Sequence, residues 1–504
     1  MRRALIAVWL LAAGGAALAQ QGSSQTSTPV NAHPTTTQPV DDPNGPRVTR
    51  LTVYPAAPPE PALKYRLLPV YGDLTDGNGA LLYYQALGIV ERAAADDPNL
   101  LKPVGDWVGL PADGLPLSEL RKVLANDDVR SALRYAGYAS RCAYCEWSFT
   151  LGRPGEGISG RLPNLSTVRT LGRLLALQAI VAVGDGDIDG AVHALTTAYA
   201  LARDIGSAPV VVCGLMGVSC AAVCKSALEE LMQSPRGLNL YWALATLPQP
   251  LIDMHRAWEG ESSTLESTVP LVAERRRRAL TPAEWNKLLT DLTYTGREQS
   301  DADERAVAAM TAVLSFPAGR DYLTSHGYSE EQVAAMLPAQ VIVTYWCDEY
   351  HHWLDEELKW YGLPYWQALP GMVRLNGEFD EAMKSVGAVS RALLPALERA
   401  AFLGKRLERD VSLLCAIEAL RAYVAVHNKL PNTLVEVTEW PIPLDPLYGK
   451  PFAYRIAPVW TDYVPYELPI GSVILESLAP PRHEPRDGVR YEVTFLRSPP
   501  TQGR

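Results

Sequence analysis

The chain has 504 residues, of which 47% are apolar and 20% are charged, so it can form a substantial core in one large domain or two to three modest ones. Its 46 basic and 56 acidic residues give a formal net charge of −10, which disfavours nucleic acid and anionic lipid as partners because both would repel the chain. Seven cysteines are too few for a disulfide scaffold of this length.

The first 19 residues have the pattern of a secretory signal peptide. Arg2 and Arg3 precede an apolar run from Ala4 to Ala13, and Ala17-Leu18-Ala19 is typical of a cleavage site. The sequence therefore predicts a secreted or periplasmic protein with a signal peptide over 1–19. The apolar run is too short for a stable membrane span, so we expect no transmembrane span in the mature chain.

The density of proline divides the rest of the chain. Residues 20–62 hold 9 prolines among Ser, Thr, Gln and Asn, which predicts a disordered tether because such a segment buries little apolar surface. We expect residues 63–430 to form a helical domain and residues 431–497 to form a turn-rich lobe with short strands. Residues 498–504 are expected to be a disordered tail.

Apolar residues at helical spacing recur through the central domain. A periodic run covers Leu81–Ala95, and two segments, Thr281–Glu284 and Ser329–Gln332, have the composition of helix-capping boxes. Alternation typical of strands is concentrated after residue 440, in Phe452–Ile456 and Tyr491–Leu496. The predicted fold is mainly α, either a multi-helix antiparallel bundle or an irregular solenoid-like array, with a small antiparallel sheet in the C-terminal lobe.

Another uncharged stretch runs from Ile205 to Cys224. Its length would permit a membrane span, but Pro209 and three glycines lower its hydrophobicity. We expect a buried core helix there.

Residues Thr167–Ile205 form the clearest supersecondary pattern. Two apolar-periodic segments flank a turn over Gly184–Gly190, and small residues stand at close-packing positions. The segment resembles a helix pair of the tetratricopeptide type, which implies an antiparallel helical hairpin.

Two further segments resemble known proteins. Residues Lys64–Pro69 with Gly77–Tyr84 resemble the opening of secreted helical bacterial proteins with no assigned function. Residues Asn428–Leu434 with Pro443–Tyr454 resemble the helix exit and Asp-Pro-x-x-Gly-x-Pro-aromatic segment of type II secretion pseudopilins. That resemblance implies a tight turn at Gly449 followed by a strand, and it implies no role in pilus assembly, since the long N-terminal assembly helix of that family is missing.

Asp185, Asp187 and Asp189 alternate with other residues before Gly190, as in the first half of a calcium-binding loop. The bidentate Glu expected at the twelfth position is replaced by Thr196. Two interpretations follow: a weak calcium site, or an acidic turn whose Asp189 caps the next helix.

Asp348, His352 and Glu356 lie four residues apart, so a helix would place them on one face. An acid-His-acid row could bind a transition metal or support acid–base catalysis. The alternative is a solvated helix face with ordinary ion pairs.

Aromatic residues concentrate directly after that row. Trp360, Tyr361, Tyr365 and Trp366 surround the helix breakers Gly362 and Pro364 and are candidates for a ligand-binding groove, or for core packing.

Cys142 and Cys145 have the spacing of a redox pair, and the sequence leaves open whether they pair. Three functions remain open. The favoured one is a non-catalytic module that binds a protein, peptide or glycan. The second is a metal-dependent hydrolase or other enzyme with its site near Asp348 and His352, and the third is a structural envelope protein. No organic cofactor is expected.

Overall fold

The computed structural model describes residues 45–110, 114–147, 163–235, 237–263, 265–266, 269–294, 302–382, 396–458 and 469–497. The predicted signal peptide over 1–19, residues 20–44 of the predicted tether and the tail over 498–504 lie outside these residues.

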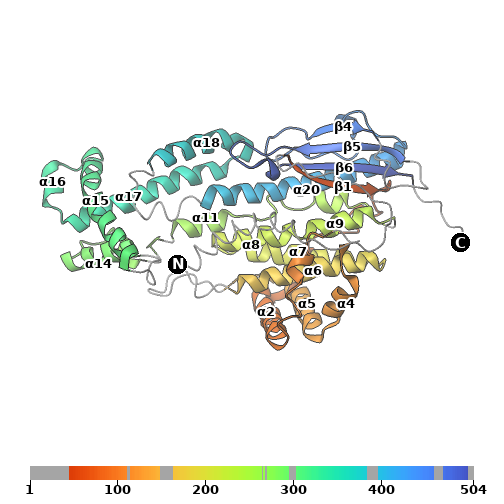
Figure 1. The fold of residues 1–504 in the computed structure, drawn as a ribbon, viewed down its shortest axis with the longest axis horizontal. Helices are drawn as coiled ribbons and strands as arrows, with labels where there is room; N and C mark the ends of the chain where they lie inside the picture. The colour runs from red at the N-terminus through yellow and green to blue at the C-terminus, as the bar shows by residue number, and fades with distance from the viewer. Residues whose placement is uncertain are drawn as a thin grey trace, which may run out of the picture.

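The molecule is elongated and mainly helical, with a small sheet near the C-terminus, so the predicted fold class is confirmed (Figure 1). The helices of its first half are α2 (Gly79–Asp96), α3 (Val104–Trp107), α4 (Leu117–Ala125), α5 (Asp127–Ala139), α6 (Leu165–Gly184), α7 (Ile188–Gly206), α8 (Val211–Ala222), α9 (Cys224–Gln233) and α10 (Tyr241–Ala245). The later helices are α11 (His255–Ser262), α13 (Pro270–Glu274), α14 (Pro282–Tyr294), α15 (Ala302–Ser325), α16 (Glu330–Ala335), α17 (Pro338–Leu358), α18 (Tyr365–Ala382) and α20 (Ala396–His427).

Helices α6 and α7 form the predicted helical hairpin. Their buried faces consist mostly of Leu, Ala and Val, because small and branched apolar residues recur at helical spacing. Helix α8 then crosses α7 closely. A Cβ atom added to Gly217 would lie 2.5 Å from the carbonyl oxygen of Ala202 and 2.9 Å from the Cα atom of Gly206, so glycine is required at this crossing.

Both predicted capping boxes are present. Thr281 Oγ1 accepts from the backbone N–H of Glu284 at 3.3 Å, and Glu284 accepts in return from the backbone N–H of Thr281 at 2.8 Å. Ser329 and Gln332 make the same reciprocal pair at the start of α16. These contacts satisfy backbone donors that the first turn of each helix leaves without intrahelical partners.

The main sheet has the strand order β1–β6–β5–β4 and contains β1 (Arg47–Val53), β4 (Ala453–Ala457), β5 (Pro469–Ser477) and β6 (Val489–Leu496). Strands β4, β5 and β6 are antiparallel neighbours, whereas β1 runs parallel to β6 with Leu51 opposite Val493. A second, two-stranded sheet joins β2 (Thr75–Asn78) and β3 (Cys142–Tyr144).

The sheet corrects two predictions. Residues 47–53 of the predicted tether form β1, because Leu51 and Val53 alternate with polar residues and bury their side chains against the core. The sheet is therefore mixed instead of purely antiparallel. Residues of β1, β5 and β6 also belong to the same hydrophobic core as α6 and α7, so residues 431–497 share the core of the helical domain (Figure 1).

Among the helices that the structure describes, two stretches, Leu165–Gly184 and Val211–Gln233, are long and apolar enough to cross a membrane by length and composition alone. Most of each is buried inside the molecule. The single buried helix expected over Ile205–Cys224 is divided instead, because a bend that includes Pro209 separates α7 from α8.

Candidate ligand-binding pocket

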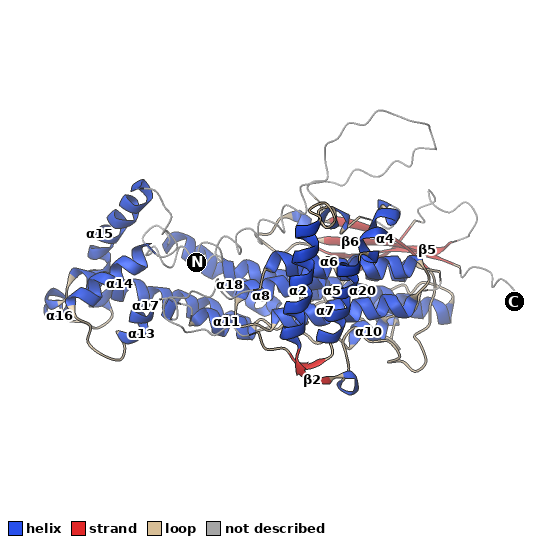
Figure 2. Cartoon of the chain, turned by 90° about the horizontal axis from the view of Figure 1, so that it is seen from below, coloured by secondary structure: helices blue, strands red, loops and turns tan. Residues whose placement is uncertain are grey.

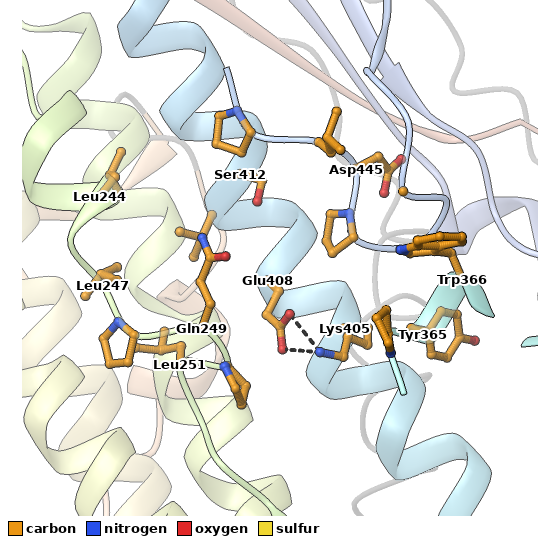
Figure 3. Close-up of a pocket in the computed structure, with 18 residues that line it drawn as sticks. Leu244, Leu247, Gln249, Leu251, Tyr365, Trp366, Lys405, Glu408, Ser412 and Asp445 are labelled. Atoms are coloured by element: carbon orange, nitrogen blue, oxygen red, sulfur yellow. Dashed lines mark hydrogen bonds and ion pairs between the residues drawn. The ribbon is translucent and has the colours of Figure 1, made fainter. Parts of the chain in front are cut away.

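A pocket of about 550 Å³ opens where three distant parts of the chain meet (Figure 3). One wall is the loop after α10, the second is the start of α18 together with α20, and the third is the turn before β4. The lining residues are Leu244, Leu247, Pro248, Gln249, Pro250, Leu251, Pro364, Tyr365, Trp366, Lys405, Glu408, Val411, Ser412, Pro443, Leu444, Asp445, Pro446 and Gly449.

The turn before β4 is built by Asp445. Its carboxylate accepts from the backbone N–H of Leu447 at 2.9 Å, and its backbone carbonyl accepts from the N–H of Gly449 at 2.7 Å. Gly449 has a φ of +63°, a conformation that side chains with a Cβ atom rarely adopt. The tight turn at Gly449 and the following strand, predicted from Pro443–Tyr454, are therefore present.

Trp366 lies directly on this turn. A Cβ atom at position 449 would come within 2.5 Å of the indole ring, so the glycine leaves the space that the ring occupies. Trp366 is 43% exposed and faces the pocket, whereas Tyr365 is buried beside it (Figure 3). An aromatic ring held rigidly at the edge of a cavity can bind a flat or apolar group.

The other two candidate aromatic residues are packing residues. Tyr361 stacks on Trp258, with ring centroids 4.5 Å apart and an interplanar angle of 8°. The ring of Trp360 covers Gly371, where an added Cβ atom would lie 2.1 Å from the indole. Neither residue lines the pocket, so the structure divides the predicted aromatic group into two pocket residues and two packing residues.

Lys405 and Glu408 are the charged pair in the pocket. The Nζ atom of Lys405 lies 2.8 and 2.9 Å from the two carboxylate oxygens of Glu408, one turn away on α20. The third charged residue, Asp445, is 3% exposed, and burial raises the pKa of its carboxyl group. The pocket therefore presents apolar walls and one internally neutralised ion pair.

The predicted acid-His-acid row lies on α17, but its members have separate partners. Asp348 accepts from Arg275 at 3.0 Å, and Glu356 pairs with Lys359, which lowers the pKa of Glu356. His352 lies edge-on to Trp353 with ring centroids 5.6 Å apart. Within the described parts of the chain, no group of three or more His, Cys, Asp or Glu side chains could hold a metal ion.

The neighbouring His351 is the residue that sequence reasoning missed on α17. Its Nε2 atom lies 2.8 Å from a carboxylate oxygen of Glu266, and its Nδ1 atom contacts the backbone carbonyl oxygen of Cys347. The hydrogen bond to Glu266 raises the pKa of His351. The residue thus joins α17 to the segment before α13.

The three candidate calcium ligands also have individual roles. Asp185 forms a two-point ion pair with Arg121, at 2.8 and 2.5 Å, and this interaction lowers the pKa of Asp185. Asp187 caps α7 by accepting from the backbone N–H of Gly190 at 2.9 Å. The cap was expected at Asp189, which instead lies inside the first turn because α7 begins at Ile188.

Cys142 and Cys145 are both free thiols, with Cys142 at the start of β3. Burial is the main cause that raises the pKa of Cys145 well above its ordinary value. A thiol in such surroundings is a weak nucleophile, because the thiolate is the reactive form.

Comparison of this chain with protein families, with curated proteins and with solved structures gave no match. The resemblances to tetratricopeptide helix pairs, to pseudopilins and to secreted helical bacterial proteins therefore stay predictions.

Proposed function

We propose that this protein is an exported, non-catalytic binding module and that the pocket beside Trp366 takes an extended, uncharged apolar peptide segment. The observation that carries the proposal is the position of Trp366, whose exposed indole forms one side of a cavity with proline- and leucine-rich walls. The N-terminal pattern Met1–Ala19 supports the export part of the proposal.

The composition of the pocket favours a peptide over a glycan. A sugar presents hydroxyl groups around its ring and needs several well-placed polar partners, whereas this lining is dominated by five prolines and several aliphatic side chains. Grooves lined by aromatic rings bind extended, proline-containing peptides elsewhere in proteins, and Trp366 supplies such a ring here.

The ion pair in the pocket favours an uncharged ligand. Lys405 and Glu408 already neutralise each other at 2.8 Å, so a charged group in the ligand would be desolvated without gaining a free partner from them. Gln249 and Ser412 are the neutral polar groups of the lining, and they can serve backbone amides of a bound segment.

A phage-displayed library of random linear peptides tests the proposal, with the mature chain as bait. Selected peptides are then synthesised and titrated by calorimetry against the wild-type protein and two variants, Trp366→Ala and Leu444→Glu. Both positions are exposed, at 43% and 54%, so the variants are expected to fold. We expect uncharged sequences rich in proline and aromatic residues, whose affinity falls at least about tenfold in either variant.

Tyr144→Ala and Leu81→Glu are the matched controls, since these residues are 58% and 64% exposed and do not line the pocket. Their affinity is expected to equal that of the wild type. Peptides that bind all five proteins equally, or a selection dominated by charged sequences, would show that the pocket is not the binding site.

A further inference from the structure

A second and larger cavity, of about 860 Å³, is lined by residues of α5, α6 and α7, by Leu124 of α4 and by Arg141. The ribbon shows α4 and α5 beside the hairpin of α6 and α7 (Figures 1 and 2). Four of the cavity's basic and aromatic residues, Arg130, Arg134, Tyr138 and Arg141, follow one another at spacings of three or four residues along and just after α5. That spacing places their side chains along one face of the helix.

His193 of α7 faces Arg141 across this cleft. The Nη2 atom of Arg141 lies 3.1 Å from Nδ1 of His193, and its Nη1 donates to the carbonyl of Gly137 at 3.2 Å. A guanidinium group has only donors, so Nδ1 of the histidine must accept and the proton of the neutral ring lies on Nε2. Arg141 is thereby held in place by two acceptors, and His193 is left with an N–H donor at Nε2.

Partial burial of the ring and the nearby charge of Arg141 both lower the pKa of His193. The lowered pKa favours the neutral ring, which agrees with the proton position that the contact with Arg141 requires.

The cleft carries a local excess of positive charge in a chain whose formal net charge is −10. Its lining holds three guanidinium groups and a single carboxylate, Asp127, which pairs with Arg130. The acids on neighbouring turns are engaged elsewhere: Asp128 pairs with Arg92 at 2.5 Å, and Asp185 pairs with Arg121. Among the described residues, no carboxylate lies opposite Arg134 or Arg141 in an ion pair.

The rest of the lining is apolar or neutral. Leu133, Leu175 and Ala194 lie buried beneath the cavity, whereas Leu124 is partly exposed and Tyr138 is 56% exposed. A ligand with one charged end and one apolar end could contact both the basic part and the apolar part of this cavity.

We propose that this cleft binds the phosphate monoester group of a small organic molecule, with Arg134, Arg141 and the Nε2–H of His193 as its donors and with Leu124 and Tyr138 as the site for the organic part. A phosphate monoester offers three terminal oxygens and close to two negative charges, so it can accept from several guanidinium N–H groups at once. A carboxylate has only two oxygens and one charge and should bind more weakly. This site is separate from the pocket beside Trp366 and does not depend on the function proposed for that pocket.

Isothermal titration calorimetry of the full chain with phenyl phosphate tests the proposal. Inorganic phosphate, benzoate and benzyl alcohol serve as comparison ligands, and vesicles containing phosphatidic acid separate a lipid headgroup from a free ester. We expect phenyl phosphate to bind at least about tenfold more tightly than benzoate, because of its second charge and third oxygen, and no heat from benzyl alcohol. Its affinity should fall as salt is added.

Arg134→Met and Arg141→Met are each expected to weaken phenyl phosphate at least about tenfold. Arg134 is exposed, so its variant is expected to fold even if the loss of Arg141 disturbs the packing. Arg277→Met removes the same charge at an exposed position after α13 and should leave the affinity unchanged. His193→Gln supplies an amide N–H near the position of Nε2 and should retain more affinity than His193→Leu.

The proposal would be overturned by no binding of phenyl phosphate at millimolar concentration, by equal affinity in Arg134→Met and the wild type, or by equal affinity for phenyl phosphate and benzyl alcohol. The protein could instead bind vesicles that contain phosphatidic acid and fail to bind phenyl phosphate. That result would identify a lipid headgroup as the ligand in place of a soluble ester, and it would also overturn the proposal.

Discussion

Two regions of this protein bury their side chains, one by apolar packing and the other by pairing buried charges. The crossing of α6, α7 and α8 is built from Leu, Ala, Val and Gly, with helix backbones in close approach at Gly217. The junction of α20 with the sheet buries charges instead, including Arg409, Glu418 and Arg421, each 0% exposed. Apolar periodicity specifies that helices pack, whereas the buried charges specify which distant segments meet.

The contacts of Arg421 illustrate this second role. Its guanidinium donates to the carbonyl oxygens of Tyr54 at 2.9 Å and Leu238 at 3.0 Å, and to both oxygens of Glu418. Asn239 in turn donates to the carbonyls of Ala56 and Glu418. Shifting any of these segments by one residue would leave a buried polar group without a partner, which costs more than the hydrogen bond itself contributes.

The largest effect is expected when one half of this buried pair is removed. Glu418→Ala leaves the guanidinium of Arg421 buried with carbonyl partners alone, so we expect a loss of about 3–5 kcal/mol in the free energy of unfolding. Urea denaturation followed by circular dichroism measures it. Glu331→Ala, at an exposed position of α16, is the control and should change stability very little. A loss below about 1 kcal/mol for Glu418→Ala would mean that the carbonyl partners alone satisfy the buried guanidinium of Arg421.

The apolar crossing should respond to added volume. Gly217→Ala introduces a Cβ atom at 2.5 Å from the carbonyl oxygen of Ala202, and backbone cannot move aside as a side chain can. We expect a loss of about 2–3 kcal/mol, measured as the shift of the urea midpoint.

Gly88→Ala is the matched control for this substitution. Gly88 lies inside α2 with no atom within 4 Å of the added Cβ position, so the same change should stabilise the protein by up to about 1 kcal/mol. Equal effects at both positions would show that helix propensity, and not the close crossing, decides the outcome.

The charged junction should also respond to acid. Burial by itself would raise the pKa of Asp410, but Arg409, Lys225 and Arg406 outweigh it and lower the pKa to about 2. The folded-state pKa lies below the unfolded value, so this carboxylate stabilises the fold above about pH 4 and loses its contribution as the pH falls toward about 2. Burial raises the pKa of Glu418 and Glu229, which act in the opposite direction, so the wild-type profile alone does not isolate Asp410.

The difference in stability between the wild type and Asp410→Asn isolates the contribution of Asp410. We expect the variant to be less stable by about 2 kcal/mol near neutral pH, with the difference disappearing toward about pH 2. Urea titrations at several pH values measure this difference. Asp355→Asn, at an exposed position of α17, should show no such dependence, and a constant difference for Asp410→Asn would contradict the assigned role.

The comparison of these regions also explains what the sequence could predict. The helices, the hairpin over α6 and α7, and the capping boxes depend on residues close in the chain, so their patterns could be read directly. Strand β1 could not, because its pairing with β6 joins positions more than 400 residues apart and its short alternation lies in a proline-rich segment. The buried arginines of α20 gave no signal either, since charged residues normally predict a solvated face.

The pocket was predictable in part. Trp366 and Tyr365 were identified because aromatic residues cluster around Gly362 and Pro364, and both line the cavity. Leu244–Leu251 and the ion pair of Lys405 with Glu408 were missed, because these segments meet only in the folded chain. The basic cleft was missed for the same reason, although the spacing of Arg130, Arg134, Tyr138 and Arg141 could have indicated one helix face.

The smallest expected effect concerns the acidic turn before α7. Each feature that resembles a calcium loop has a structural role: Asp185 pairs with Arg121, Asp187 caps α7, and Gly190 lies where a Cβ atom would clash with Asp187 at 2.1 Å. We therefore expect Asp187→Ala to cost about 1 kcal/mol in the absence of calcium, and Asp189→Ala to cost less than about 0.5 kcal/mol.

Thermal unfolding with and without millimolar calcium completes this last test. If the segment is a capped turn, calcium leaves the midpoint unchanged in the wild type and in both variants, because a ligand that does not bind the folded state cannot stabilise it. A rise of several degrees in the wild type that is lost in Asp187→Ala would instead establish an ion site. If calcium binds here, Asp185 has to release Arg121, so Arg121→Gln should strengthen the calcium response. If the segment is only a capped turn, Arg121→Gln should remain insensitive to calcium.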